Sequence, residues 1–373
     1  MTTHPFSPQD VSTMQDALGL AQAAIGLTDP NPRVGCVLIS ADGQRAEGHT
    51  QPAGQAHAEV MALRAAAQAG WNPRGATAYV TLEPCAHHGR TPPCCDALVQ
   101  AGVARVVVAL ADPNPLVAGQ GIARLRAAGV QVDVGLLADE AHALNIGFFS
   151  RMVRGRPWVR MKIAASLDGR TALPNGLSQW ITGEAARTDG HAWRRRAGAV
   201  LTGVGTVRED NPRLDVRLVP TARQPMRVVV DSRLETPDNA RVLAPPGPVL
   251  IYAAEPAEAR IAALQAQGAE VVLQPGPHGK VDLDAVIEDL GRREVNELHV
   301  EAGHKLNGSL LAAGLVDELL VYLAPQLLGQ GREMAAFGPL QQLADALPWQ
   351  FTQVDRIGAD LRLLARRPAP LGF

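Results

Sequence analysis

Residues 57–95 begin with His57-Ala58-Glu59 and end with Glu83-Pro84-Cys85-Ala86-His87-His88-Gly89-Arg90-Thr91-Pro92-Pro93-Cys94-Cys95. Zinc prefers imidazole and thiolate ligands, and a catalytic zinc site uses three protein ligands and leaves the fourth position to water. His57, Cys85 and Cys94 supply such a set. Glu59 follows the histidine by two residues and stays off the metal, which is the arrangement of zinc deaminases. We therefore predict a catalytic zinc centre in which Glu59 is the general acid and base.

Other assignments of these residues remain open. A closed zinc site without catalysis is one of them, but it does not explain a histidine–carboxylate spacing with only three strong ligands. Cys95 is adjacent to Cys94 and can replace it as a ligand, although we favour Cys94. His87 or His88 can serve as a fourth ligand, but a substrate contact or an ordinary loop position is the better interpretation of both.

The segment between the two cysteines is unusually long. Nucleic-acid deaminases have Cys-x-x-Cys, whereas residues 86–93 separate Cys85 from Cys94 and carry His87, Arg90 and two prolines. This stiff polar loop suits a substrate with an additional anionic group. We also expect His57 and Cys85 each to begin a helix, so that two positive dipole ends point toward the metal.

The surrounding sequence alternates between helical and extended patterns. Helical spacing predicts helices, and short apolar runs predict strands, with Asp42-Gly43 turning one strand into the next. Cys36 lies in one of these runs and is expected to be a small buried hydrophobe. The order α, β, β, α, β, α, β, α, β predicts a layered α/β domain with helices on both faces of a mostly parallel or mixed sheet. The helices are expected at residues 10–26, 57–69, 96–101 and 121–128, and the strands at 34–40, 77–82, 103–110 and 130–134.

The second half also predicts an α/β domain. Thr182 is the expected N-cap of its first helix. Gly203-Val204-Gly205 follows a strand, but Arg208 stands where a dinucleotide fingerprint needs its third glycine, so nucleotide would be bound by another fold. Helices are expected at residues 182–197, 283–290 and 307–313, and strands at 157–165, 199–202, 227–231, 249–253, 270–273, 297–301, 318–323, 350–357 and 360–365.

Length and composition limit the possible classes. A chain of 373 residues predicts two domains, and a net charge of -2 argues against a dedicated nucleic-acid binder. Three of the four cysteines crowd the proposed metal loop, which argues against a disulfide framework and for a reducing cytoplasm. No signal peptide is visible and no run of about 18 apolar residues occurs, so we expect a cytoplasmic protein without a membrane partner.

Several motifs resemble those of a known family. Residues 84–94 resemble the PCxHxGRTPPC signature of the deaminase half of the bifunctional riboflavin-biosynthesis enzymes. Asn31-Pro32-Arg33-Val34-Gly35, the segment 48–59 and Asp112-Pro113-Asn114-Pro115 resemble other signatures of that half. Residues 162–170, 178–182, 202–214, 230–232 and 301–303 are similar to the reductase half, so the resemblance covers almost the whole chain.

This resemblance implies a fold and an activity for each half. Residues 1–155 would form a cytidine-deaminase-like α/β/α sandwich with one zinc ion, and residues 156–373 a dihydrofolate-reductase-like α/β domain that uses NADPH. The enzyme would hydrolytically deaminate 2,5-diamino-6-(5-phosphoribosylamino)pyrimidin-4-one and then reduce its ribosyl group to a ribityl chain. Its partner would be this small phosphoribosyl-pyrimidine, not nucleic acid, and a homo-oligomer would form through the reductase domain.

The resemblance also implies site residues. In the deaminase half Asn31, His49 and His87 would contact the pyrimidine. In the reductase half the substrate would be held by Lys162, Ser178, Arg194, Leu214, Arg217 and Glu301. NADPH would be held by Ala164, Trp180, Thr206, Asp210, Ser232 and a loop of Gly303, His304, Lys305, Leu306, Asn307, Gly308 and Ser309.

These roles make chemical sense, although simpler interpretations exist for some residues. Arginines can fork onto a ribose phosphate, and backbone amides that lead into a helix suit a pyrophosphate. Without the resemblance, Asn31 is equally well a turn residue, His49 a surface histidine and Trp180 a core residue. Arg195 and Arg196 are expected on a solvated helix face.

Two other functions compete with this prediction. One is a nucleic-acid base deaminase with an accessory domain, which the charge balance and the long loop between the cysteines disfavour. The other is a non-catalytic zinc module in which the second half is a scaffold. In that case loss of the Glu59 carboxylate would change no activity.

Overall fold

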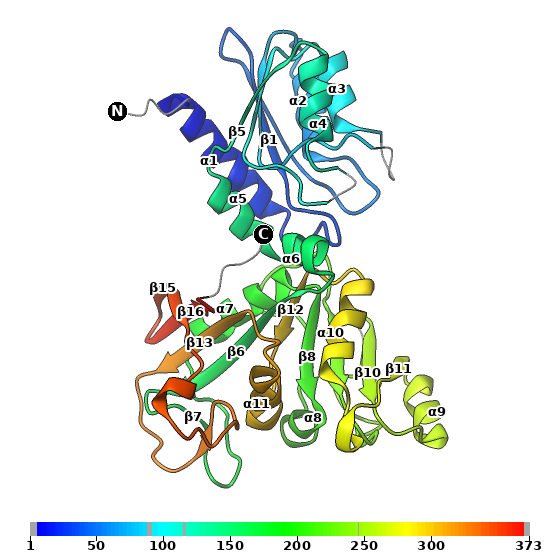
Figure 1. Cartoon of the computed structure of the whole chain (residues 1–373), viewed down its shortest axis with the longest axis vertical. Helices are drawn as coiled ribbons and strands as arrows, with labels where there is room; N and C mark the ends of the chain where they lie inside the picture. The colour runs from blue at the N-terminus through cyan, green and yellow to red at the C-terminus, as the bar shows by residue number, and fades with distance from the viewer. Residues whose placement is uncertain (1–5, 88–91, 115–116, 245, 369–373) are drawn as a thin grey trace. The chain divides into compact units, whose positions relative to one another are not determined.

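Both halves of the chain fold around a β-sheet of their own (Figure 1). The computed structural model describes residues 6–87, 92–114, 117–244 and 246–368. It divides into two compact units, Met1–Arg154 and Gly155–Gly372.

The sheet of the first unit has the strand order β2-β1-β3-β4-β5. Strand β1 is antiparallel to both of its neighbours, while β3, β4 and β5 are parallel, so the sheet is mixed. The elements are α1 (Pro8–Ala23), β1 (Gly35–Ile39), β2 (Arg45–His49), α2 (Ala58–Gln68), β3 (Thr77–Val80), α3 (Cys94–Gln100), β4 (Arg105–Val108), α4 (Gln120–Ala127), β5 (Gln131–Val134), α5 (Ala138–Leu144) and α6 (Ile146–Arg154).

Helices cover both faces of this sheet. Apolar side chains of α2, α3 and α4 pack against one face, to which Cys36, Leu38 and Val106 belong. Met14 and Leu18 of α1, together with α5, cover the other face. The unit is therefore an α/β/α sandwich, as the order of elements predicts (Figure 1), and Cys36 is buried within β1 as expected.

The sheet of the second unit has the order β11-β10-β9-β8-β12-β6-β13-β16-β15. Neighbours from β11 to β13 are parallel, and β16 is antiparallel to both β13 and β15. The elements are β6 (Trp158–Ser166), β7 (Arg170–Ala172), α7 (Glu184–Arg196), β8 (Ala199–Gly203), α8 (Val204–Asp210), β9 (Met226–Val230), β10 (Val249–Ala253), α9 (Glu258–Ala266), β11 (Ala269–Leu273), a 3-10 turn (Pro277–Gly279), α10 (Leu283–Arg292), β12 (Glu297–Val300), α11 (His304–Ala312), β13 (Glu318–Ala324), β14 (Arg332–Glu333), a second 3-10 turn (Leu343–Asp345), β15 (Gln350–Ile357) and β16 (Asp360–Arg366).

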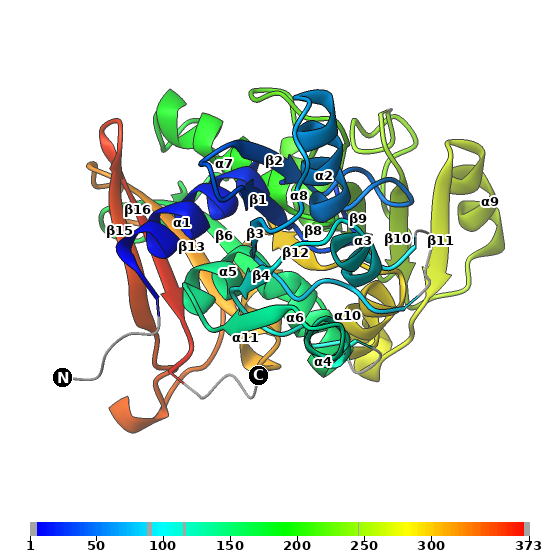
Figure 2. The same cartoon turned by 90° about the horizontal axis from the view of Figure 1, so that it is seen from above.

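Helices also cover both faces of the second sheet. Val286 and Leu290 of α10 and Leu310 of α11 pack on one face. Figures 1 and 2 show these two helices on the same side of the sheet. Helices α8 and α9 pack on the other face, and α7 joins them through Trp193, which contacts the core near β13 and β16. Both expected α/β units are therefore present.

A buried cluster of charges lies between α7 and the sheet. Arg160 of β6 is 2% exposed and contacts two carboxylates, Glu297 of β12 at 2.7 Å and Glu318 of β13 at 2.5 Å. Arg196 also pairs with Glu297 at 2.7 Å, and Arg366 with Glu318 at 2.9 Å. Each carboxylate thus meets two guanidinium groups, which compensates for its burial.

The N-cap of helix α7 lies one residue later than expected. Gly183, not Thr182, occupies the N-cap position, and no side chain of the cap residue bonds the first turn. The backbone N–H of Gly183 instead donates to the carboxylate of Asp360 at 2.7 Å. The prediction that Thr182 caps this helix is therefore wrong. Asp360, the first residue of strand β16, instead accepts a hydrogen bond at the N-terminal end of the helix.

Candidate functional site

The three predicted zinc ligands converge in the first unit. His57 is the N-cap of α2, Cys85 lies in the loop after β3, and Cys94 is the first residue of α3. Their ligand atoms all lie within 4.8 Å of one another, with Nδ1 of His57 at 3.3 Å from the sulfur of Cys94 and 3.7 Å from that of Cys85. A tetrahedral zinc site with bonds of about 2.0 to 2.3 Å separates its ligand atoms by roughly 3.5 Å. The donor set therefore fits zinc in both chemistry and size.

One expectation about the ligands is wrong. Cys85 does not begin a helix, whereas Cys94 does, with Pro93 at the N-cap of α3. The backbone N–H of Cys94 accordingly points at the sulfur of Cys85 at 3.3 Å. The positive helix ends thus belong to His57 and Cys94, and Cys85 receives its polar contact from the helix that carries the other thiol.

Electrostatics in this site favour proton transfer by Glu59. This residue is 4% exposed in the first turn of α2. Burial, with a further contribution from the thiolate of Cys85, raises the pKa of Glu59 to about 7. Hydrogen bonds from Cys94 and His57 lower the pKa of Cys85 to about 4, so this thiol ionises readily. A carboxyl with a pKa near neutrality can both accept and donate a proton under cellular conditions.

The geometry also decides between the two adjacent cysteines. Cys95 is fully buried and its sulfur faces the carboxylate of Asp96 at 3.8 Å. Within the described parts of the chain, the cluster of candidate metal ligands consists of the predicted histidine and Cys85 with Cys94, not Cys95. His87 is exposed in its loop, and His88, like Arg90, lies outside the described residues.

The other two predicted contacts of the pyrimidine lie on neighbouring segments. Asn31 occupies the turn after α1, where its backbone N–H donates to Thr28 at 2.9 Å. His49 is the last residue of β2 and pairs with Gly35 of β1. Their roles as substrate contacts stay predictions.

In the second unit a polar cluster lies near the carboxyl ends of parallel strands β6 and β12. Arg194 of α7 forms a two-pronged pair with Glu301, whose second contact, from Nη2 to Oε2, measures 2.8 Å. Its Nη1 donates to the backbone carbonyl of Asp215 at 2.9 Å. Burial alone would raise the pKa of Glu301, but the charge of Arg194 outweighs it and holds that pKa well below its usual range. Burial lowers the pKa of the neighbouring Lys162, although Glu301 opposes this effect.

His191 and Asp215, which the sequence did not mark as site residues, complete this cluster. His191 lies one turn before Arg194 on α7, and its Nδ1 accepts from the backbone N–H of Arg217 at 3.1 Å. The carboxylate of Asp215 accepts from the guanidinium of Arg217 at 2.7 Å. The i, i+3 spacing of His191 and Arg194 is the signal that was available in the sequence.

Other predicted residues of the reductase half lie on several elements of the second unit. Ser178 donates to Asp210 at the end of α8 at 3.3 Å, and Leu214 is buried. Ala164 lies on β6, and Thr206 on α8. The hydroxyl of Ser232 after β9 accepts from the backbone of residue 281 at 3.2 Å.

Trp180 is a surface residue. Its side chain is 65% exposed, so the alternative interpretation as a core residue is wrong. The guanidinium of Arg187 lies 4.7 Å from the centre of the indole ring. A large exposed ring beside a cation is well placed to stack on a ligand.

The predicted loop 303–309 is largely helical. Gly303 is the N-cap of α11, so His304, Lys305, Leu306, Asn307, Gly308 and Ser309 form its first turns. Gly308 lies within this helix, and a Cβ there would lie 1.9 Å from the carbonyl oxygen of Ala336, so only glycine fits at this position. The backbone amides at the start of α11 still suit a pyrophosphate, since they have no partner within the helix. The residues therefore fit a dinucleotide, while the part played by each side chain stays a prediction.

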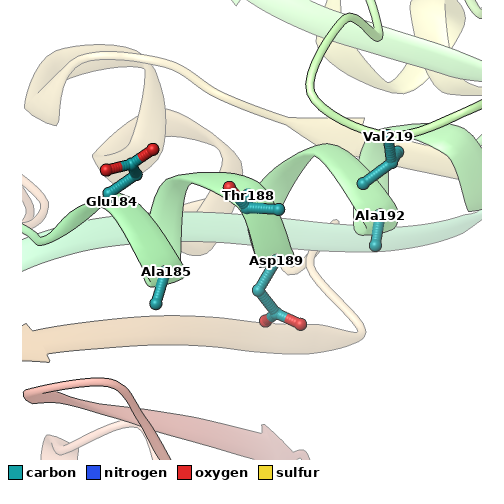
Figure 3. Close-up of a pocket in the computed structure, with 6 residues that line it drawn as sticks. All are labelled: Glu184, Ala185, Thr188, Asp189, Ala192 and Val219. Carbon is teal, nitrogen blue, oxygen red and sulfur yellow. The ribbon is translucent and has the colours of Figure 1, made fainter.

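A groove on α7 does not belong to either cluster. The groove has a volume of about 740 Å³. Side chains of α7, together with Val219 from a neighbouring loop, line it (Figure 3). The lining contains none of the predicted site residues and consists of Glu184, Ala185, Thr188, Asp189, Ala192 and Val219. The carboxylate of Asp189 is already engaged, since it accepts from the hydroxyl of Tyr322 at 2.6 Å.

The zinc triad with its adjacent carboxylate, set in an α/β/α sandwich, defines a zinc deaminase that is joined to a second α/β unit. Comparisons with known proteins agree for both parts. Residues 7–110 match the cytidine and deoxycytidylate deaminase zinc-binding region, and residues 157–363 match the RibD C-terminal domain. The chain belongs to the RibD family of bifunctional riboflavin-biosynthesis deaminase/reductases.

Curated relatives match the chain along nearly its whole length. The riboflavin biosynthesis protein RibD of Escherichia coli (strain K12) is 46% identical over 374 residues, which cover 95% of this chain and 98% of that protein. The RibD of Aquifex aeolicus is 40% identical over 96% of this chain and 98% of its own length. The predicted family is thus confirmed, and it replaces the two competing functions.

Solved structures agree with the fold. Acinetobacter baumannii RibD superposes with a TM-score of 0.87 at 41% identity, covering 97% of this chain and 99% of that one. A Thermotoga maritima diaminohydroxyphosphoribosylaminopyrimidine deaminase/5-amino-6-(5-phosphoribosylamino)uracil reductase gives a TM-score of 0.86 at 31% identity over 96% and 98%. The predicted fold classes, a cytidine-deaminase-like domain followed by a dihydrofolate-reductase-like domain, are confirmed. None of the helices in the described parts of the chain has the length and apolarity to cross a membrane.

Proposed function

We propose that this chain catalyses two consecutive steps of riboflavin biosynthesis. Residues 1–155 would hydrolyse the exocyclic amine of 2,5-diamino-6-(5-phosphoribosylamino)pyrimidin-4-one and release ammonia. Residues 156–373 would transfer hydride from NADPH to the sugar carbon and open the ribosyl group to a ribityl chain. The observation that carries the proposal is the triad of His57, Cys85 and Cys94 beside a buried Glu59, in a chain that matches the Thermotoga maritima deaminase/reductase along its length.

The side chains of the first unit divide the work of deamination. His57, Cys85 and Cys94 hold zinc, which when bound supplies an activated water as nucleophile. Glu59 would accept a proton from the attacking water and pass it to the ring nitrogen. It would then take the second proton from the hydroxyl now bound to the ring carbon and give it to the amine, which leaves as ammonia while the carbonyl forms. Its pKa of about 7, raised by burial, suits both directions of transfer. Asn31, His49 and His87 orient the pyrimidine by contacts at its edge.

The second unit binds the deaminated intermediate beside the cofactor. NADPH supplies the hydride, and the amides that begin α11, with Thr206, hold its phosphates. Arg194 is hydrogen-bonded to Glu301 and to the carbonyl of Asp215, and this fixed position of the Glu301 carboxylate supports a role for Glu301 in holding the sugar. Arg217 is 43% exposed and is the better placed guanidinium for the ribose phosphate.

We also propose that two copies associate through the reductase unit. Strand β15 forms one edge of the sheet, and its Phe351 and Val354 are 66% and 58% exposed. Edge strands with exposed apolar side chains pair readily with another chain. Light scattering should show a dimer that Phe351→Lys dissociates, while Leu273→Lys on the opposite edge leaves it intact. A dimer that survives Phe351→Lys would contradict this interface.

A cytoplasmic location completes the proposal. All four cysteines are free, and two of them are the sulfur ligands of the triad. Thiolate ligands persist in a reducing compartment, where disulfides are rare. Oxidation of these thiols would remove ligands from the metal.

Removal of zinc tests whether the two sites act independently. Full-length protein is treated with a chelator and then assayed for ammonia release from the aminopyrimidine phosphate and for NADPH oxidation with the deaminated intermediate. We expect ammonia release to stop and NADPH oxidation to continue, because the triad lies in the first unit alone. Loss of both activities together would refute independent sites, and unchanged ammonia release would refute a zinc deaminase.

A further inference from the structure

Helix α4 lies next to the metal triad without contributing a ligand. Glu83, two residues before Cys85, is 4% exposed. Its carboxylate accepts hydrogen bonds from backbone N–H groups at the N-terminal end of α4. Oε1 accepts from Gly121 at 2.9 Å and Ile122 at 3.1 Å. Oε2 accepts from Gly119 at 2.9 Å and also from the preceding loop, at residue 112, at 3.1 Å. One carboxylate therefore satisfies amides that have no partner within the helix.

The backbone next to Glu83 is also packed against this helix. A Cβ at Gly121 would lie 1.9 Å from the carbonyl oxygen of Pro84, so the first turn of α4 touches the chain immediately before Cys85. Glycine alone permits so close an approach of two backbones. The segment that leads to Cys85 is thus fixed by hydrogen bonds and by contact.

Arg124, in the middle of α4, reaches the other side of Cys85. Its Nη1 donates to the carbonyl oxygen of Ala86 at 3.1 Å. Its Nε and Nη2 contact the two carboxylate oxygens of Asp96, both at 2.8 Å. Ala86 follows Cys85 directly, and Asp96 lies in the first turn of the helix that begins at Cys94. One guanidinium therefore joins the two segments that carry the sulfur ligands.

We propose that Glu83 and Arg124 are positioning residues of the zinc centre. Glu83 holds the chain before Cys85, and Arg124 ties the chain after it to the helix of Cys94. Two cysteines in a Cys-x-x-Cys motif are placed by a single turn, whereas residues 86–93 separate this pair and a second element must set their distance. The proposal rests on the zinc centre described above and assigns the residues that keep its two thiolates in register.

Zinc release from the full-length protein tests the role of Arg124. Arg124→Gln removes the fork to Asp96, and we expect zinc to pass to a chromogenic chelator about 10-fold faster, since supporting contacts of metal sites change affinity by about 10- to 100-fold. Arg126→Gln on the same helix is the matched control, because Arg126 donates instead to the carbonyl of Val132 at 2.9 Å. This control should release zinc at the rate of the unmodified protein.

Cobalt substitution gives a readout of geometry that a purely structural role would not change. We expect the cobalt–thiolate absorption bands to shift in Arg124→Gln, to recover in part in Arg124→Lys, and to stay unchanged in Arg126→Gln. Glu83→Gln should shift these bands further. Both oxygens of Glu83 accept from backbone N–H groups, whereas the NH2 of glutamine cannot accept and would face those same N–H groups. Far-UV circular dichroism and thermal unfolding of each variant verify that the first unit, which carries both residues, is folded.

Distinct outcomes would overturn the proposal. If Arg124 positions the two thiolates, Arg124→Gln differs from Arg126→Gln in zinc release and in cobalt spectrum. Equal behaviour of the two variants in both measurements therefore refutes the proposal. If Glu83→Gln fails to fold, the Arg124 series decides alone. A wild-type protein that binds no zinc would refute the metal centre itself, and that result is distinct from normal binding with no effect of the variants.

Discussion

Replacing Glu318 by glutamine tests how the second unit tolerates charge in its interior. Glu318 is fully buried and contacts Arg160 at 2.5 Å and Arg366 at 2.9 Å. Burial alone would raise the pKa of Glu318, but the two guanidinium groups outweigh it and lower that pKa. Glutamine keeps the shape of the side chain and removes its charge, so the guanidinium of Arg160 stays buried with less compensation.

The expected loss of stability follows from this geometry. Removing one partner of a buried ion pair costs about 3–5 kcal/mol, because the other charge remains out of water. For a unit of this size, each 1 kcal/mol lowers Tm by about 2–4 °C. We therefore expect Glu318→Gln to lower the Tm of the second unit by about 10 °C.

Calorimetry and tryptophan fluorescence measure this change. The indole ring of Trp193 lies 4.4 Å from the guanidinium carbon of Arg160, so its emission reports on the cluster. Glu288→Gln is the control, since Glu288 is 69% exposed and 3.9 Å from Arg292, and surface pairs of this kind contribute about 0–1 kcal/mol. A shift for Glu318→Gln no larger than that of the control would refute the reasoning.

The pH dependence of this difference has a defined sign. Because the folded pKa of Glu318 is lowered, its stabilisation is present above the ordinary pKa of about 4.3 and is lost as pH falls through the folded value. The gap between wild type and Glu318→Gln should therefore be full at neutral pH and shrink below about pH 4.

Three further perturbations address the sites. Glu59→Gln should slow ammonia release by about 10²- to 10⁴-fold with zinc content and NADPH oxidation unchanged, and full activity would remove Glu59 from the mechanism. Metal analysis should find zinc lost in Cys94→Ala and retained in Cys95→Ala, and the reverse would exchange the two assignments. Burial, with Arg194 nearby, lowers the pKa of His191 to about 4. As pH falls from about 6.5 to 4, His191 therefore takes up a proton in the unfolded chain but not in the folded unit, which lowers the free energy of unfolding of the second unit. His191→Gln should not show this loss of stability. Equal pH profiles of the two proteins would contradict this.

Local sequence patterns predict most of the strands but not their order. The apolar run 249–253 coincides with β10, and the β-branched run 227–231 lies within one residue of β9. By contrast, the position of β12 between β8 and β6 depends on contacts between segments far apart in the chain. Periodicity reports which residues face a core, whereas strand order is decided by how elements pack on one another.

Helix ends were predicted less well, because distant residues determine some of them. The amide of Gly183 is bonded by Asp360, which is 177 residues away. The sequence predicts a helix start at Cys85, but no helix begins there, and the neighbouring Glu83 bonds the N-terminal end of another helix, α4. The family resemblance implied a loop at residues 303–309, although most of this segment is helical and Gly308 packs α11 closely against the backbone of Ala336.

The zinc triad could be predicted because its ligands form a motif with fixed spacing. Its supporting residues could not, since Arg124 contacts a backbone carbonyl 38 residues away and leaves no pattern in the sequence. Asp215 was missed for the same reason, because its carbonyl contacts Arg194, 21 residues away. For His191 the spacing to Arg194 was a weak signal, but its contact with the backbone of Arg217, 26 residues away, is visible only in the fold. Motifs thus reveal ligands, while the residues that hold ligands in place emerge only from tertiary contacts.

The place of β12 in the sheet also bears on how the protein is synthesised. β6 and β8 leave the ribosome long before residues 297–300, yet in the finished sheet both pair with β12 rather than with each other. The second unit therefore cannot close until most of the chain has been translated, whereas the first unit is complete at residue 154. A nascent chain that stalls before β12 would carry a complete first unit, followed by β6 without either of its neighbours and by β8 without its neighbour on one edge. Unpaired strand edges of this kind are prone to aggregation.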